Sequence, residues 1–174
     1  GKMAGYQRKY VANGFDKPYL PTISIDSPSI LTTQRWGLIP SWVTSEKEFK
    51  ANTLMARNDE LFEKTSYKTY WQNRCLIFCT GFFEPHYPSG SQKHQSWFIR
   101  PKEKKLFAFG GIFSVWNGIH TCTIITKEAT PEMAIVHNDG RRMPLILTGA
   151  ASRNWLNPVL TMAEMKELLK FEYP

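Results

Sequence analysis

Residues 75–87 of this 174-residue chain read CLIFCTGFFEPHY. Apolar or small residues fill positions 75–83 almost without interruption, which is typical of a buried β-strand. The run ends at Glu84, directly after two phenylalanines. A carboxylate beside apolar surface is costly to ionise, so it is usually paired, exposed to solvent or used in chemistry. The stretch therefore indicates a sheet-rich fold and marks Glu84 as a candidate functional residue.

Several other segments have strand character. They are rich in aromatic and β-branched residues and are separated by Gly, Pro, Ser and Lys clusters, as hairpin-linked antiparallel strands would be. These are runs 96–100, 106–113, 120–126 and 142–147. Run 18–25, PYLPTISI, is typical of an edge strand or an extended loop because prolines interrupt its β-branched residues. We predict one domain over residues 1–174, an α+β fold with a mainly antiparallel sheet and flanking short helices.

Three short helices are predicted from residues that suit helix starts. Ser66 could cap a helix over 67–73. Thr130 precedes a proline that suits the first helical position, which predicts a short helix ending near His137. Thr161 and Glu164 form a capping-box pattern that opens a helix reaching residue 170. Its apolar stripe, expected in the core, consists of Met162, Met165, Leu168 and Leu169.

Charge and cysteine content limit the class of protein. The formal net charge of +7 permits attraction to polyanions, but no Lys/Arg run is long enough to define a binding arm, and solubility alone also explains it. Cys75, Cys79 and Cys122 form an odd set in apolar stretches, so we expect reduced thiols. The sequence has neither an apolar segment of about 18 residues nor a charged-then-apolar leader. It predicts a cytoplasmic protein without membrane contact.

Two kinds of active site are disfavoured. A zinc site built from His86, His94 and the cysteines would need a second close pair of ligands, and none is present in the sequence. An internal Ser or Cys nucleophile has no support, because there is no G-x-S-x-G sequence and the cysteines lie in hydrophobic strands. A glycine-rich phosphate loop is also missing. We therefore expect no metal and no cofactor.

The stronger candidate site pairs Glu84 with His137, since each stands where an apolar segment ends. The turn after the histidine carries Arg141 and Arg142, whose guanidinium groups suit phosphate oxygens. Trp36 and Trp42 could stack on unpaired bases or pack in the core, and the sequence leaves both open. An isolated Glu or His is often a surface or structural residue, so the pairing is a hypothesis about proximity.

The order of several motifs carries a family resemblance. They are WGLIPSW (36–42), Ala56-Arg57, CLIFCTGFFE (75–84), LFAFGGIFSVW (106–116) and IVHNDGRRMPLIL (135–147). Together they resemble the SOS-response-associated peptidase family, SRAP, a group that shields abasic sites in single-stranded DNA. The match runs from about residue 13 to the end of the chain. The resemblance implies a mainly antiparallel, barrel-like α+β fold around a positively charged groove, with single-stranded DNA carrying abasic sites as the partner and a monomeric protein.

The resemblance also implies a chemistry. In the family, an amino-terminal cysteine, exposed by removal of the initiator methionine, forms a Schiff base with the abasic sugar and then a stable thiazolidine crosslink. Glu84 matches the family glutamate that exchanges protons with the amine, and His137 matches the histidine that acts as acid and base. Arg57 and Arg142 match arginines expected on DNA phosphates. The 174 residues begin Gly1-Lys-Met and do not contain this cysteine, so the chemistry requires that the full-length protein begin with it, and a truncated or degenerate copy is the alternative.

The chain departs from the family pattern at three internal positions. Met55 replaces an asparagine, Thr80 an aspartate, and Pro85 the tryptophan that follows the motif glutamate. Loss of an amide near the reaction centre leaves a second hypothesis open, a diverged module that binds single-stranded DNA without chemistry. The leading hypothesis includes an associated thiol autopeptidase activity, and a third hypothesis, a cysteine peptidase acting on other proteins, fits the family name.

Overall fold

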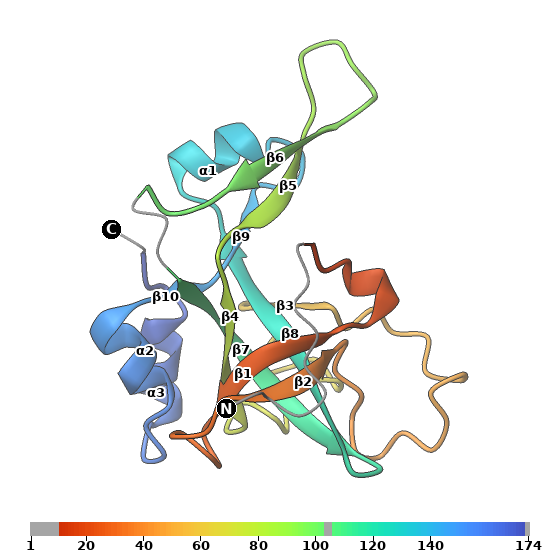
Figure 1. The fold of residues 1–174 in the computed structure, drawn as a ribbon, viewed down its shortest axis with the longest axis vertical. Helices are drawn as coiled ribbons and strands as arrows, with labels where there is room; N and C mark the ends of the chain where they lie inside the picture. Colours follow the sequence, from red (N-terminus) through yellow and green to blue (C-terminus); the bar gives the residue numbers. More distant parts are fainter. Residues whose placement is uncertain (1–10, 103–105, 173–174) are drawn as a thin grey trace.

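The computed structural model describes residues 11–102 and 106–172, and its centre is a five-stranded barrel (Figure 1). The barrel strands are β1 (Tyr19–Ser24), β2 (Thr32–Trp36), β4 (Arg74–Cys79), β7 (Phe107–Trp116) and β8 (Ile119–Glu128). Their order is β7-β4-β1-β2-β8, and the additional pairing of β7 with β8 closes the ring. All these pairs are antiparallel except β2 with β8, which is parallel. The predicted α+β class with a mainly antiparallel, barrel-like sheet is confirmed.

The long β7–β8 hairpin follows from its turn. Asn117 and Gly118 both have positive φ, 48° and 79°, as a two-residue turn between twisted strands requires. The turn sets a register in which Trp116 pairs with Ile119, and nine further residues of β8 continue beyond that pair. The hairpin therefore provides a rigid support along the length of the barrel.

Three short strands extend the sheet toward the end that carries the candidate site. β3 (Met55–Arg57) pairs with β8 in parallel, β9 (Arg142–Pro144) pairs with β8 antiparallel, and β10 (Ile146–Leu147) pairs with β7. The predicted strand over 142–147 is thus two strands on different partners. As a result, Arg57 and Arg142 lie on strands that share β8.

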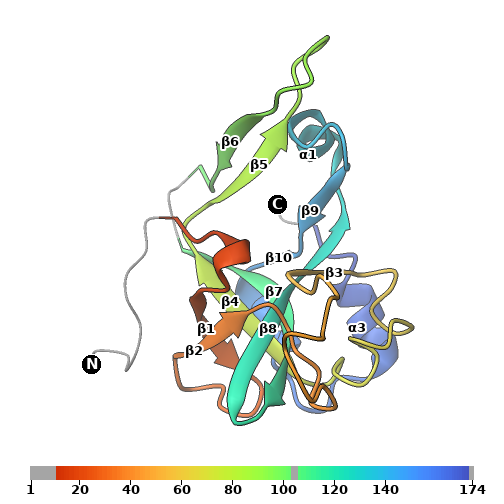
Figure 2. The same cartoon turned by 90° about the vertical axis from the view of Figure 1, so that its right-hand side faces the viewer.

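A second, two-stranded sheet projects from the barrel (Figures 1 and 2). It consists of β5 (Phe82–His86) and β6 (Gln95–Ile99). The single strand predicted over 75–83 is wrong, because the chain bends at Thr80 and Gly81 between β4 and β5. A Cβ at position 81 would lie 2.3 Å from the Phe98 ring, so the bend requires a glycine. The break directs β5, and with it Glu84, away from the barrel.

The prediction of an edge strand near residues 18–25 is also wrong. β1 pairs with β2 on one side and with β4 on the other, so it lies inside the sheet. The pairing with β4 begins at Thr22, just after Pro21, so the proline faces only β2 in the register. An interior strand can therefore contain this proline without leaving a gap in the ladder to β4.

The helices are short and mostly begin where the sequence predicts. α1 (Pro131–Val136) is capped by the Thr130 side chain, and α3 (Met162–Leu168) has both bonds of the predicted capping box. The helix predicted over 67–73 is wrong, because that segment forms consecutive turns. α2 (Gly149–Trp155) was not predicted, and the 3-10 helix η1 (Gly14–Asp16) lies before β1.

Alternate residues of the barrel strands pack into two clusters. Leu76 and Ile112 belong to the larger cluster with Trp155 of α2 and Met165 of α3. The second cluster contains Cys75, Ile77, Phe107, Phe109, Phe113, Cys122 and Ile124. Met165 is buried as predicted, whereas Met162 is 40% exposed, so the core stripe of α3 is narrower than predicted. None of the helices in the described residues combines the length and apolar character needed to cross a membrane.

Candidate active site at the β5–α1 junction

Glu84 lies in the middle of β5, opposite Trp97 of β6. Its side chain is only 13% exposed. Burial raises the pKa of Glu84, because the charged carboxylate loses solvation, while the nearby His137 favours the charged form and opposes the shift. Glu84 is therefore a carboxyl group able to hold its proton at higher pH than an exposed glutamate.

His137 is the residue that ends α1, and the structure brings it to Glu84. Its Nδ1 lies 3.5 Å from Glu84 Oε2 and 2.8 Å from the backbone oxygen of Arg142. A carbonyl oxygen can only accept, so Nδ1 carries the hydrogen in that bond. In the neutral imidazole the free lone pair is then on Nε2, which becomes the nitrogen able to take up a proton.

Gly140 makes room for this orientation of the ring. A Cβ at position 140 would lie 2.8 Å from His137 Nε2 and 3.0 Å from Cε1. Any side chain there would have to push the imidazole away from its position. The absence of a side chain at 140 thus leaves space beside the nitrogen that can exchange protons.

Two sets of hydrogen bonds hold the end of α1 against β5. His86 Nδ1 lies 3.1 Å from the oxygen of Ile135 and 3.0 Å from that of Val136. Asn138 accepts from the Tyr87 N–H at 3.0 Å and donates to the Tyr87 oxygen at 2.7 Å. We call these contacts of His86 and Asn138 the α1 latch. The latch connects the strand that carries Glu84 to the helix that carries His137.

Arg142 is held by the ends of β3 and β8. Its guanidinium donates to Thr126 Oγ1 at 3.2 Å, to the Thr126 oxygen at 2.7 Å and to Asn58 Oδ1 at 2.9 Å. The side chain is 20% exposed, and burial lowers the pKa of Arg142. These bonds fix the guanidinium, and through the same residue's backbone oxygen they also fix His137.

Arg57 lies close to Arg142 but has its own acidic partners. Its Nη2 is 2.7 Å from Asp59 Oδ2, and its Nε is 3.5 Å from Glu60 Oε1. Asp59 is also 3.8 Å from Arg142 Nη2, so this carboxylate lies between the two guanidiniums. The hydrogen bond from Arg57 lowers the pKa of Asp59 to about 2. Both arginines thus lie beside an ionised carboxylate.

The other predicted binding residues differ in exposure. Arg141 is exposed, has a positive φ of 46°, and its N–H donates to the His137 oxygen at 3.0 Å. Trp36 is half-buried and donates from Nε1 to the Leu54 oxygen at 2.8 Å, which fits a packing role. Trp42 is 56% exposed and meets Phe49 edge to face. Trp42 therefore presents the free aromatic surface of the two.

The cysteines are poor nucleophiles in this fold. Cys75 and Cys122 are buried and Cys79 is half-buried, and burial raises the pKa of Cys79 and of Cys122 to about 12. Their thiols keep their protons at neutral pH. Among the residues that the structure describes, no three His, Cys, Asp or Glu side chains gather as metal ligands would.

Several residues of the site were not predicted from sequence. Asp59 could have been found, because an acidic residue two positions after Arg57 is a candidate ion-pair partner for it. Asn138 and Gly140 belong to the turn that was noted for its arginines. Their contacts with Tyr87 and with the His137 ring depend on three-dimensional placement, so no local pattern indicates them.

Comparisons with known proteins identify the family of this chain. Residues 6–173 match the family described as SOS response associated peptidase (SRAP). The chain is 37% identical over 145 residues to the abasic site processing protein YoqW of Bacillus subtilis, covering 80% of this chain and 62% of that protein. It is 31% identical over 176 residues to the abasic site processing protein HMCES of Xenopus tropicalis, covering 85% of this chain and 50% of that protein. The chain thus spans about half to two thirds of these relatives.

Solved structures show the same fold. A crystal structure of a protein from Bacteroides thetaiotaomicron has a TM-score of 0.82 at 34% identity, over 91% of this chain and 71% of that one. A protein from Bordetella bronchiseptica shares the fold with a TM-score of 0.78 at 23% identity, over 91% and 80% of the two chains. From the family match over nearly its whole length, we conclude that this chain belongs to the SRAP family.

Proposed function

We propose that this protein binds single-stranded DNA and processes abasic sites by forming a covalent crosslink through an amino-terminal cysteine of the full-length protein. The observation that carries the proposal is the 3.5 Å contact between His137 Nδ1 and Glu84 Oε2. The same histidine contacts the backbone of Arg142, whose guanidinium shares Asp59 with Arg57. Relatives named abasic site processing proteins support the same role. The arrangement combines an acid, a base and phosphate-binding cations.

His137 would act first, on the closed form of the abasic sugar. The aldehyde is released when the sugar hydroxyl loses a proton and the ring oxygen gains one, so one group must accept and donate in turn. His137 Nε2 suits this exchange because Nδ1–H is held by the Arg142 oxygen. The imidazole returns to its starting protonation state, and the sugar becomes an open-chain aldehyde.

Glu84 would act in the next step. The cysteine amine adds to the aldehyde carbon, and the resulting carbinolamine loses water to give a Schiff base. A protonated Glu84 can donate the proton that lets hydroxide leave as water and then recover one from the nitrogen. The thiol sulfur then adds to the imine carbon, its proton passes to the nitrogen, and a thiazolidine closes. The raised pKa of Glu84 suits this proton donation.

The arginines and Trp42 would position the strand. Arg57 is 49% exposed, and a phosphate could replace Asp59 on its planar fork. Arg141 is exposed beside His137, whereas Arg142 contributes charge from a fixed, partly buried place. Trp42 offers a ring face to an unpaired base. Trp36 would act indirectly, by packing within the protein at the end of β2.

The test is adduct formation with a single-stranded oligonucleotide that carries one abasic site. The full-length protein, with its amino terminus established by mass spectrometry, should form an adduct that survives heating. Glu84→Gln and His137→Ala should slow single-turnover adduct formation by roughly 10²–10⁴-fold, the usual contribution of acid–base groups. If full-length protein with a terminal cysteine yields no adduct, the proposed reaction is rejected.

A non-catalytic DNA-binding module is the second candidate, favoured by Met55. This residue stands where the family pattern has an asparagine, and its side chain is 43% exposed at the start of β3. A thioether cannot replace the hydrogen bonds of an amide. A module of this kind would bind single-stranded DNA with a steep loss of affinity on added salt, yet yield no adduct. Met55→Asn would then be the variant that tests for recovery of crosslinking.

A further inference from the structure

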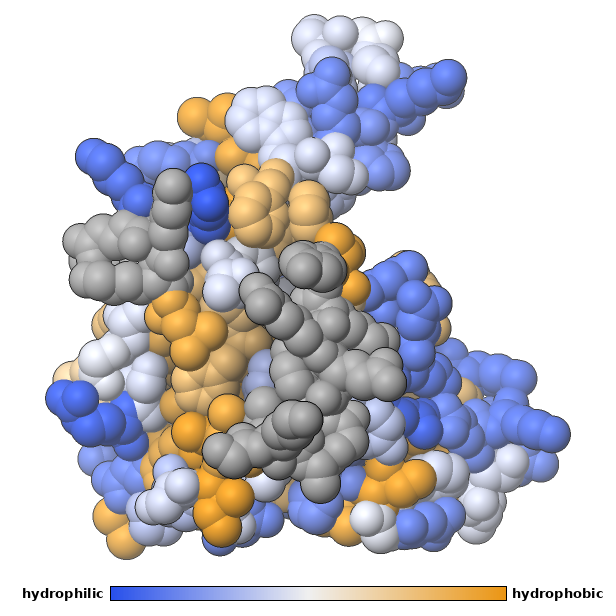
Figure 3. Space-filling model, in the orientation of Figure 1, coloured by the Kyte–Doolittle hydropathy of each residue, from blue (hydrophilic) through white to orange (hydrophobic). Residues whose placement is uncertain are grey.

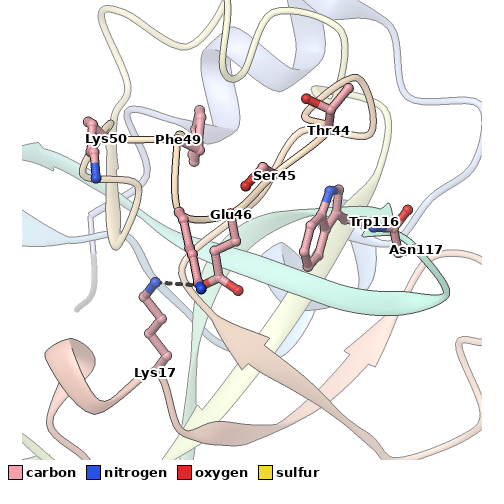
Figure 4. A pocket seen from close by; sticks show the side chains of 9 residues that line it. Lys17, Thr44, Ser45, Glu46, Phe49, Lys50, Trp116 and Asn117 are labelled. Carbon is pink, nitrogen blue, oxygen red and sulfur yellow. Dashed lines mark hydrogen bonds and ion pairs between the residues drawn. The ribbon is translucent and has the colours of Figure 1, made fainter.

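A pocket lies away from Glu84 and His137, beside the turn of the β7–β8 hairpin (Figure 4). Its volume is about 830 Å³, and it is open to solvent. Its lining comes from η1's end, the loop after β2 and the hairpin turn: Lys17, Thr44, Ser45, Glu46, Lys47, Phe49, Lys50, Trp116 and Asn117. The proposed reaction leaves this pocket without a role.

The aromatic side of the pocket is fixed in place. Trp116 Nε1 donates to the Val43 oxygen at 2.6 Å, which holds the indole against the loop. Phe49 is half-buried and meets the exposed Trp42 with ring centroids 6.1 Å apart. Trp42 is thus in direct contact with a residue that lines the pocket. The surface proposed for base stacking and the pocket are therefore continuous.

The charged side of the pocket is cationic. Glu46 binds Lys17 at 2.6 Å and also Arg35, and hydrogen bonds from these two residues lower the pKa of Glu46. Lys47 and Lys50 form no ion pair with any other residue that the structure describes, and both are exposed. Figure 3 shows a predominantly hydrophilic surface on the side of the molecule where this loop lies in Figure 1. Two lysine charges therefore remain available to an anionic ligand.

We propose that this pocket binds a nucleotide of the same DNA strand on one side of the abasic nucleotide, with Lys47 and Lys50 on its phosphates and the Phe49 ring beside its base. The inference deepens the proposed function and rests on it. A ligand with both a phosphate and a flat ring matches a pocket with both lysines and aromatic rings. The assignment gives the protein a second anchor for the strand, remote from the reaction.

Strand β8 sets the distance between the two sites. Trp116 pairs with Ile119 at its start, and Arg142 pairs with Glu128 at its end. Nine residue steps at about 3.3 Å give at most about 30 Å between these pairs. At a stacked spacing of about 3.4 Å per nucleotide, about nine nucleotides cover that span, and fewer do so in an extended strand. A flank of one nucleotide is therefore too short, and a flank of about nine is long enough.

The experiment compares full-length wild-type protein with the Lys47→Gln/Lys50→Gln double variant on three oligonucleotides. One carries a single nucleotide on each side of the abasic site, and the others extend it by about nine nucleotides at the 5′ or the 3′ end only. The measured quantity is the ratio of affinities for a long and the short oligonucleotide, by fluorescence anisotropy with an abasic analogue that has no aldehyde, because a crosslink would prevent equilibrium. We expect one extension to raise wild-type affinity at least about tenfold and the double variant to lose most of that gain. The salt slope on that oligonucleotide should fall by about 1.4, since each phosphate contact contributes about 0.7 on a single strand.

The control removes the same charge from the opposite side of the molecule. Lys166→Gln/Lys170→Gln changes two exposed lysines at the α3 end, where α3 lies across the barrel from the loop in Figure 1. This variant should keep the wild-type ratio. If it lowers the ratio as much as the pocket variant, or if neither extension raises wild-type affinity, the pocket assignment is overturned. Failure of the wild-type protein to bind or crosslink any of the three oligonucleotides would instead reject the proposed function.

Discussion

The carboxyl group of Glu84 is largely buried and has one titratable partner at 3.5 Å, the His137 imidazole. Phe83 precedes it, Trp97 lies opposite on β6, and its side chain is 13% exposed. Burial in this position disfavours the charge, and the raised pKa records that cost. Glu84 is thus suited to carry a proton, and its ionisation lowers the stability of the folded state.

Glu84→Gln should therefore change how stability depends on pH. Because the folded pKa is raised, the folded state binds more protons than the unfolded state above about pH 4.3, so wild-type stability falls as pH rises toward the folded pKa. The amide does not titrate, so the free energy of unfolding of the variant should increase relative to wild type across that window. Urea unfolding from pH 4 to pH 8 measures the difference. A difference that is constant with pH would contradict the burial of Glu84 as the cause of its shift.

Gly140→Ala should disturb His137 without touching any proposed DNA contact. The new Cβ would lie 2.8 Å from Nε2, so the imidazole must move, while the φ angle of Gly140 is not among the positive ones. A misplacement near 1 Å can cost about 100-fold in rate, so single-turnover adduct formation should fall by up to about that factor at unchanged DNA affinity. In a His137→Ala background the same change should have no further effect. Additive losses would show that Gly140 acts through something other than the ring.

The sequence indicated both proposed acid–base residues but not the roles of their atoms. Glu84 could be predicted because a carboxylate after nine apolar or small residues is unusual, and His137 because it ends a capped helix. The hydrogen on His137 Nδ1 is held by the backbone oxygen of Arg142, which lies on the other side of a turn. That Nε2 is free depends on Gly140. The hydrogen bond at Nδ1 and the space beside Nε2 both exist only in the folded turn, so residue spacing in the sequence does not predict them.

The junction of α1 with β5 determines how well the two residues meet. α1 has only six residues and no buried ones, so it gains little from core packing. The α1 latch, formed by His86 and Asn138, supplies hydrogen bonds in place of apolar contacts. The distance between Glu84 and His137 thus depends on polar contacts at the surface of the molecule.

Asn138→Ala should loosen this junction and slow the reaction more than it weakens DNA binding. The variant removes both bonds to Tyr87, so the Tyr87 amide should exchange hydrogen faster, and crosslinking should slow by up to about 100-fold through misplacement of His137. Hydrogen exchange and single-turnover kinetics provide the two measurements. Asp139→Ala, at the next exposed position, is the matched control and should leave both unchanged. Normal Tyr87 protection with slow chemistry would contradict the positioning role.

The elements that were predicted correctly are those with a local chemical signal. Thr130 and Thr161 cap α1 and α3 because their hydroxyls accept from the first turn, and this depends only on neighbouring residues. The segment 67–73 lacks such a determinant beyond Ser66 and forms turns instead, with Tyr67 and Tyr70 buried against the core. The run 75–83 was continuous in composition, and the bend at Gly81 depends on the close approach of Phe98, which leaves no room for a Cβ at position 81.

Pairing of β3 and β9 with the same strand, β8, brings the arginines together, and this pairing could not be predicted from local pattern. The parallel pairing of β3 with β8 places Arg57 opposite Thr126, whose oxygen binds Arg142. These strands are about 70 positions apart in sequence, so their register depends on packing across the whole chain. Composition predicted a sheet-rich domain correctly, because that depends on strand content alone. The order of the strands in the sheet depends instead on which strand edges are still unpaired as the chain folds, and composition does not contain that information.

The helical layer is joined to the barrel through a buried cation, and this makes a prediction for the stability of the whole molecule. Arg74 of β4 is 1% exposed and donates to the oxygens of Trp155 at 2.8 Å and Asn157 at 2.6 Å. Arg74→Met would leave these carbonyls without their donor, so the free energy of unfolding should fall by about 2–4 kcal/mol. Arg153→Met, an exposed arginine on α2, is the matched control and should stay within about 0.5 kcal/mol of wild type. Urea unfolding followed by tryptophan fluorescence measures both, because Trp155 is buried between α2 and the sheet. Equal stabilities for the two variants would mean that packing of α2 and α3, without the guanidinium, suffices to hold the helices on the barrel.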